Sequence, residues 1–118
     1  MAEEKKLPHG FVIDEQGRLV GKIPGGIELL GKRHFDFVMR EALTGDLLDA
    51  ELDADLTKVL HFNAELMVRQ LVSVGDFTGP FTVNMLRSIK PASWRILRTA
   101  QGVLDAMGEA EPASAPAS

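Results

Sequence analysis

The chain contains no cysteine and no tyrosine among its 118 residues. Without cysteine it can form neither a disulfide nor a thiolate zinc site, and it has no cysteine nucleophile. A cluster of one charge sign is also lacking, because the 13 lysine and arginine residues are scattered and the net charge is −4 at pH 7. Nucleic-acid binding needs a basic stripe that releases counterions from phosphates. The composition therefore argues against a nucleic-acid partner.

Long apolar runs are absent as well. No segment approaches the roughly 20 apolar residues of a membrane-spanning helix. The first residues, "MAEEKK", are charged and are not followed by the apolar stretch of a signal peptide. We therefore expect no membrane association, and the lack of cysteine is compatible with a reducing cytoplasm.

The chain does contain enough apolar residues to form the core of one small domain. Hydrophobic residues make up 45% and charged residues 25%, which is ordinary for a globular domain. We assign residues 1–107 to a single domain. The remainder, "GEAEPASAPAS" at residues 108–118, has no large apolar residue, so we predict a disordered tail there.

Short apolar runs before residue 41 predict a small antiparallel sheet. The runs at residues 12–13 and 19–20 flank a turn in which Gly17 would supply a positive φ angle. "IPGG" at residues 23–26 is expected to break the chain. Together with the hairpin described next, these signals predict β-hairpins over about residues 11–40.

The second predicted hairpin centres on Gly31-Lys32. Residues 27–30 precede this pair, and Phe35, Phe37 and Met39 alternate with polar residues after it. A period of two indicates a strand with one apolar face, and a Gly-Lys pair suits a type II′ turn. Leu29 is a further candidate for that apolar face.

The same stretch, "GIELLGKR" from Gly26 to Arg33, is one residue short of a phosphate-binding P-loop. A P-loop needs a helix after it, so that backbone N–H groups and the helix dipole hold the phosphates. Here the following residues alternate as a strand, and Arg33 stands where serine or threonine would hold magnesium. We therefore predict no nucleotide site and a solvent-facing Lys32.

After residue 43 the apolar pattern changes to a helical period. We predict three to four helices, at about residues 44–52, 55–74, 82–89 and 91–107. Thr44 is the expected N-cap of the first helix, with Asp46 near its positive end. Pro91 suits the first turn of the last helix. Strands followed by helices make the predicted fold class α+β.

No residue pattern indicates catalysis or metal binding. The acidic run from Asp49 has Ala54 where a calcium loop needs glycine and Leu60 where it needs glutamate. His9, His34 and His61 form no metal-binding motif. We therefore predict no cofactor, no metal and no enzymatic activity.

Three large aromatic residues are candidates for partner binding. Phe77 and Phe81 flank Gly79-Pro80 in a predicted loop, where large apolar groups are hard to bury. Trp94 lies in the last predicted helix. For all three, a place in the hydrophobic core is the alternative.

At "FVMREALTGDLLDAE", residues 37–51, the sequence resembles the tail assembly chaperones of Mu-like and related long-tailed phages. Their usual form is close to L-R-E-P-T-x-G-D-L, and Arg40, Glu41, Thr44 and Asp46 match it in kind. Ala42 replaces the usual proline, and a missing spacer shifts the register by about one residue. The segment "MLRSIKPASWRILRTAQGVLDAM" is similar to the closing helix of the family, although Trp94 stands where aspartate is common.

The resemblance implies a non-enzymatic role in phage tail morphogenesis. Such a chaperone binds the tape measure protein and helps recruit tail tube subunits, in the cytoplasm of the infected bacterial host, and is not retained in the mature virion. Arg40, Glu41, Thr44 and Asp46 would then have a structural role at the start of the first helix. Self-association is left open. The alternatives are a structural tail-completion or connector protein of the virion and a small ligand-binding domain or enzyme.

Overall fold

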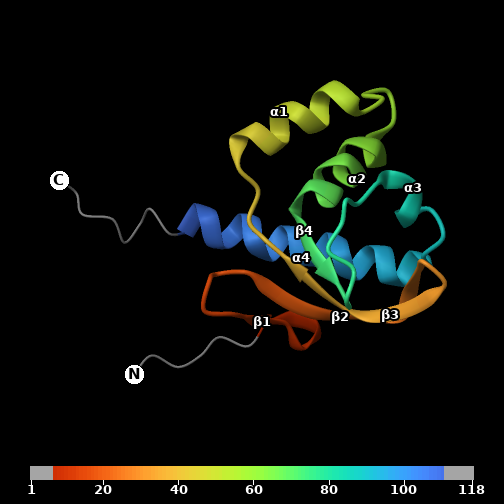
Figure 1. Cartoon of the computed structure of the whole chain (residues 1–118). Helices are drawn as coiled ribbons and strands as arrows, with labels where there is room; N and C mark the ends of the chain where they lie inside the picture. Colours follow the sequence, from red (N-terminus) through yellow and green to blue (C-terminus); the bar gives the residue numbers. More distant parts are fainter. Residues whose placement is uncertain (1–6, 111–118) are drawn as a thin grey trace.

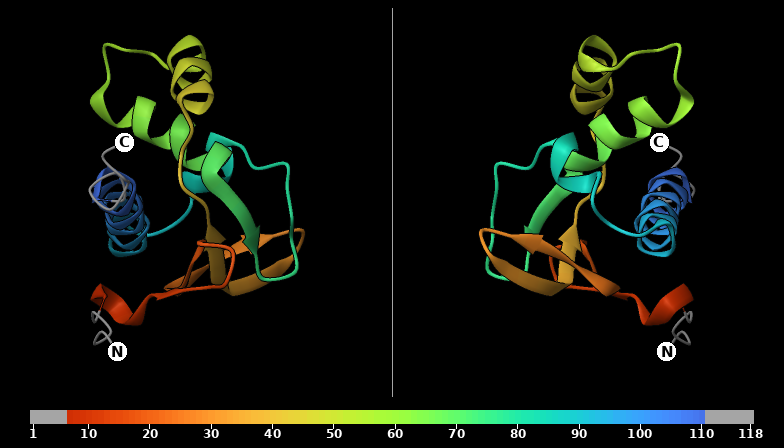
Figure 2. Two further views of the ribbon diagram at one scale, coloured as in Figure 1. Left: turned by 90° about the vertical axis from the view of Figure 1, so that its left-hand side faces the viewer. Right: turned by 90° about the vertical axis from the view of Figure 1, so that its right-hand side faces the viewer.

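The computed structural model describes residues 7–110, which form one four-stranded antiparallel sheet and a set of helices (Figure 1). The strands are adjacent in the order β1-β2-β3-β4, and the long helices lie on one side of the sheet (Figure 2). This arrangement confirms the predicted α+β class. The elements are a 3-10 turn η1 (Pro8–Gly10), β1 (Val12–Ile13), β2 (Leu19–Leu29), β3 (Lys32–Met39), α1 (Thr44–Asp53), α2 (Val59–Gln70), β4 (Leu71–Val74), α3 (Val83–Leu86) and α4 (Pro91–Ala110).

The first hairpin forms as predicted. Its register pairs Val12 with Val20, and Gly17 has a φ of +81°. The Asp14 carboxylate accepts hydrogen bonds from the backbone N–H groups of Gln16 and Arg18, each at 2.9 Å. An aspartate that bonds the backbone two residues on is a common turn device, so local chemistry alone is sufficient here.

The second hairpin is present, but its turn lies one residue earlier than predicted. Leu30 and Gly31, with φ angles of +54° and +78°, connect β2 to β3, and Lys32 is the first residue of β3. Two successive positive φ angles are the mark of a type I′ turn, whose twist matches that of the strands. The predicted type II′ turn at Gly31-Lys32 is therefore wrong. Lys32 is solvent-facing as expected.

The predicted break at residues 23–26 is also wrong, because these residues lie inside β2. The sheet accommodates them as a bulge. Lys22 pairs with Asp36 and Ile27 pairs with His34, so β2 advances five residues while β3 advances two. Proline and glycine at this position mark an irregularity of the ladder and not the end of the strand.

The bulge changes which face of β3 is buried. Phe37 and Met39 are fully buried, as predicted, and so is Leu29. Phe35 is 47% exposed, whereas its neighbour His34 is buried. The sequence pattern predicts Phe35 on the apolar face, together with Phe37 and Met39. The strict alternation of buried and exposed residues fails there, because the register shift turns His34 inward in place of Phe35.

The predicted helix at residues 55–74 is shorter than expected. It begins at Val59 and ends at Gln70, and residues 71–74 continue as β4, in which Val74 pairs with Phe37. A short apolar run does not distinguish a buried strand from a helical turn. The free edge of β3 favours the strand, because the backbone N–H and C=O groups of both segments are hydrogen-bonded when residues 71–74 pair with it.

Two other helix boundaries differ from expectation. The helix predicted at residues 82–89 is reduced to the single turn α3, and α4 runs on to Ala110, so the predicted tail does not begin at residue 108. Residues 111–118 and 1–6 lie outside the described part. The core between sheet and helices contains Leu19, Ile23, Phe37, Met39, Met67, Val74, Leu97, Ala100 and Leu104, each at most 1% exposed.

Gly21 marks the closest packing within this core, and it supplies a stability test. A Cβ at Gly21 would lie 2.7 Å from Phe11 Cδ1 and 2.8 Å from Phe37 Cε1. We expect Gly21→Ala to lower the free energy of unfolding by about 1–3 kcal/mol through overpacking. Gly102→Ala is the matched control, because Gly102 lies in α4 with open space around it. That change should raise stability by about 0.5–1 kcal/mol. Urea denaturation measures both, and equal stability of Gly21→Ala and the unchanged chain would contradict this packing.

Candidate partner-binding surface

α1, the loop after it and the first turn of α2 project away from the sheet (Figures 1 and 2). This segment, residues 43–60, holds seven of the eleven large hydrophobic side chains that are exposed in the described part of the chain. Scattered apolar side chains are normal on a surface, but a concentration of them marks an interaction site. We call these seven residues, which are between 41% and 83% exposed, the apolar arm: Leu43, Leu47, Leu48, Leu52, Leu56, Val59 and Leu60.

The outward direction of the arm follows from how α1 packs. Ala50 is completely buried, and α1 lies against α2 through this small residue. Because successive residues of an α-helix are about 100° apart, Leu48 and Leu52 lie nearly opposite Ala50 and face away from α2. α1 therefore has apolar residues on two opposite faces, and only the face that contains Ala50 is covered by α2.

A groove of about 820 Å³ lies next to the arm, between the start of α2, α3 and the start of α4. The arm and the groove share Val59 and Leu60. Its size is within the range of sites that hold a ligand or an anchoring side chain. The apolar lining is Val59, Leu60, Ala64, Val83, Leu86, Ile89, Pro91 and Trp94, and the polar lining is Asp55, Lys58, His61 and Arg87.

The polar lining of the groove is predominantly basic. Lys58 lies 3.6 Å from the Asp55 carboxylate, which also accepts a hydrogen bond from the Thr57 hydroxyl at 2.6 Å. Hydrogen bonds from Thr57 are the main reason that the pKa of Asp55 is lowered. Arg87 is exposed and makes no ion pair with any side chain that the structure describes. The groove thus offers an apolar floor with uncompensated positive charge beside it.

Of the three aromatic candidates, the structure brings only Trp94 into this groove. Phe77 and Phe81 stack on each other edge to face, with ring centroids 5.2 Å apart, and pack partly against the core. They lie outside the groove, so the three residues do not form one site.

Sequence reasoning missed the arm itself. A helix over the predicted residues 55–74 would place Leu56, Val59 and Leu60 on one face, yet they are 61%, 82% and 59% exposed. The helix begins only at Val59, so its first turn extends past the core. The sequence does contain one signal for an exposed apolar surface. Leu48 and Leu52 lie among acidic residues, and they give α1 more apolar positions than a single buried face needs.

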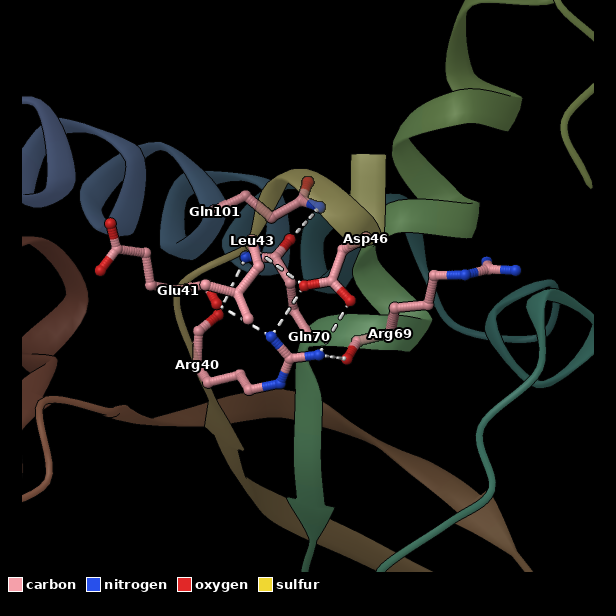
Figure 3. Close-up of polar contacts among 7 residues, drawn as sticks. All are labelled: Arg40, Glu41, Leu43, Asp46, Arg69, Gln70 and Gln101. Carbon is pink, nitrogen blue, oxygen red and sulfur yellow. Dashed lines mark hydrogen bonds and ion pairs between the residues drawn. The ribbon is translucent and has the colours of Figure 1, made fainter. Parts of the chain in front are cut away.

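The start of α1 is held by Arg40 and Asp46, two of the four residues singled out in the sequence at this position (Figure 3). The Arg40 guanidinium donates two hydrogen bonds to the Asp46 carboxylate, at 2.8 and 3.0 Å. It also donates to the backbone carbonyls of Arg69, at 2.8 Å, and Glu41, at 3.0 Å. Bidentate pairing of this kind fixes both position and orientation.

The predicted N-cap at Thr44 is wrong, because Thr44 is the first helical residue and Leu43 occupies the cap position. The leucine side chain has no oxygen with which to cap a helix. The Asp46 carboxylate instead reaches back and accepts a hydrogen bond from the Leu43 backbone N–H at 2.8 Å. Glu41 contributes its carbonyl to Arg40, while its side chain lies against Gly108 of α4. The four motif residues are thus neighbours, but only Arg40 and Asp46 pair through their side chains.

A buried amide chain connects this pair to the rest of the fold (Figure 3). The Gln70 side chain donates to the Arg40 carbonyl at 3.0 Å, and the Gln101 side chain donates to Gln70 Oε1 at 2.9 Å. Both glutamines are almost fully buried. The position of the arm is therefore coupled to β3, α2 and α4 together.

With this geometry established, the chain can be compared with known proteins. No family model matches it, and no solved structure does. A curated protein is 38% identical over 66 residues, which is 46% of this chain and 52% of that protein. It is the "Mu-like prophage FluMu protein gp41" of Haemophilus influenzae.

The chain is similar to a prophage protein. It spans about half the length of that relative, whose name states no activity. The match therefore supports a phage-related role for this chain without specifying which one. In the described part, no helix is long and apolar enough to cross a bilayer.

The Arg40–Asp46 pair gives a pH-dependent prediction. Hydrogen bonds from Arg40 hold the pKa of Asp46 below its ordinary value. Such a lowered pKa stabilises the fold above the unfolded-state pKa of about 3.9, and the contribution is lost as the pH falls through the folded-state pKa. We expect Asp46→Asn to cost about 1–2 kcal/mol at neutral pH and progressively less below about pH 4. The exposed Asp49→Asn change, in the same helix, is the control. Urea titrations across pH would contradict the pairing if both variants had the same small effect.

Proposed function

We propose that this protein is a phage tail assembly chaperone, which binds the tape measure protein and helps recruit tail tube subunits during tail morphogenesis. It would act in the cytoplasm of the infected bacterial host and would not remain in the mature virion. Its role would be binding and not catalysis.

The observation that carries the proposal is the exposed apolar arm beside the groove. A chaperone for a long helical client needs apolar groups in water, and a monomeric protein without a partner rarely shows such a concentration. Helix-in-groove recognition uses this combination of an apolar floor and charged edges. A net charge of −4 favours the solubility that a chaperone with an exposed apolar arm needs.

The phage context comes from two sources. The prophage relative supports it over part of the chain. The segment around Arg40 and Asp46 also resembles the family motif, and in the fold these residues secure the base of the arm. The motif residues would then serve binding indirectly, because they determine where α1 and its leucines lie.

A structural tail component of the virion is the second candidate, because the name of the prophage relative states no role and fits either one. The two candidate functions differ in whether the protein remains in the finished phage particle. Mass spectrometry of purified particles separates them, since a chaperone should be absent and a tail-completion or connector protein should be present in stoichiometric amount.

Client binding can be tested by co-expression with the tape measure protein of the same phage. We expect the two proteins to co-purify, and Leu48→Asp combined with Leu52→Asp to reduce recovery of the tape measure protein roughly tenfold or more. Leu30→Asp is the matched control, because Leu30 is 88% exposed and lies in a hairpin turn outside the arm and groove. Aspartate also tolerates its positive φ.

Deletion of the gene from the phage tests the role in assembly. Loss of tails with heads still formed is the expected result in electron micrographs of the lysate. Normal tails in the deletion strain, or equal tape measure recovery by the arm variant and the Leu30→Asp control, would overturn the proposal.

A further inference from the structure

We propose that two copies of this chain associate reciprocally, with α1 of each copy seated in the groove of the other. The pairing goes beyond client binding, and it does not require the phage function to be correct. It rests on a match between two surfaces of the same molecule. The first is the outer face of α1 and the second is the groove between α2, α3 and α4.

α1 has the properties of a helix that docks in such a groove. It is ten residues long, which corresponds to about 15 Å. Leu48 and Leu52 are one turn apart on its uncovered face, in the i, i+4 spacing of anchor residues. The helix contains four acidic residues and no basic one. Asp46 is paired with Arg40 and Asp53 with Arg69, so the uncompensated negative charge of α1 lies on Asp49 and Glu51.

The groove carries the opposite charge. Lys58 and Arg87 line it, and the one acidic residue there, Asp55, is already engaged by Lys58 and Thr57. Arg87 remains without an ionic partner among the described side chains. An acidic helix with two leucines therefore complements both the floor and the edge of the groove, and such complementarity selects partners.

The helix cannot fill the groove of its own molecule. Ala50 binds α1 to α2, and this contact directs Leu48 and Leu52 away from the body of the protein. A second copy of this chain can supply the same acidic helix to the groove. Because every copy carries both surfaces, a two-fold pair buries two helices in two grooves and closes on itself.

Charge exchange tests the pairing directly. In the first variant, Lys58→Glu and Arg87→Glu make the groove acidic. In the second, Asp49→Lys and Glu51→Lys make α1 basic. Like charges then meet in either homodimer, whereas a mixture of the two variants, or all four changes in one chain, restores opposite charges at both contacts.

We expect a dimer of the unchanged chain by light scattering coupled to size-exclusion chromatography over a concentration series. Each double variant should dimerise roughly tenfold or more weakly. The mixture and the fourfold variant should recover the dimer. Leu48→Asp with Leu52→Asp should abolish it, while Leu30→Asp should not. Circular dichroism checks that every variant is folded.

The result that would overturn the proposal is a monomer at every concentration, or a dimer that the charge reversals leave unchanged. Loss of dimer in both double variants without recovery in the mixture would also overturn it, because the two surfaces would then not face each other. The oligomeric state is measured in the absence of the tape measure protein. A failed dimer therefore leaves the chaperone proposal standing, and a failed tape measure co-purification leaves the dimer standing.

Discussion

The bidentate pair between Arg40 and Asp46 is the constraint on which the exposed half of the molecule depends. Arg40 follows β3 immediately and Asp46 lies in the first turn of α1, so the pair determines how the helices leave the sheet. The same guanidinium binds the carbonyl of Arg69 near the end of α2. One side chain thereby joins a strand, the start of one helix and the end of the next, and Asp46 also replaces the missing cap.

That constraint explains how the protein can keep apolar side chains in water without collapsing onto them. α1 is held at its first turn by Arg40, in its middle by the buried Ala50 and at its last residue by the ion pair of Asp53 with Arg69, so it has a defined position even though its outer face is uncovered. The buried amides of Gln70 and Gln101 extend this support into α4. A surface presented in this way is preorganised, which lowers the entropy lost when a partner binds.

Much of the fold could be predicted from local patterns, and the errors have specific physical causes. The turn at Gly17 and the start of α4 at Pro91 are decided by neighbours in sequence, so they were predicted correctly. The bulge after Lys22 and the strand β4 depend on pairing with distant residues of β3. No local pattern contains that information, because an apolar run at residues 71–74 fits either a helix or a strand.

The sequence by itself determined the class of fold, the acidic surface charge, the absence of cysteine chemistry and the motif that places Arg40 near Asp46. Those properties depend on composition and on residues only a few positions apart. Only the tertiary structure decided which apolar residues are exposed. Leu48, Leu52 and Val59 have the same hydrophobicity as core residues, and their exposure follows from where α1 and α2 stand relative to the sheet. Burial is a property of the packed arrangement, so the arm and the groove became visible only there.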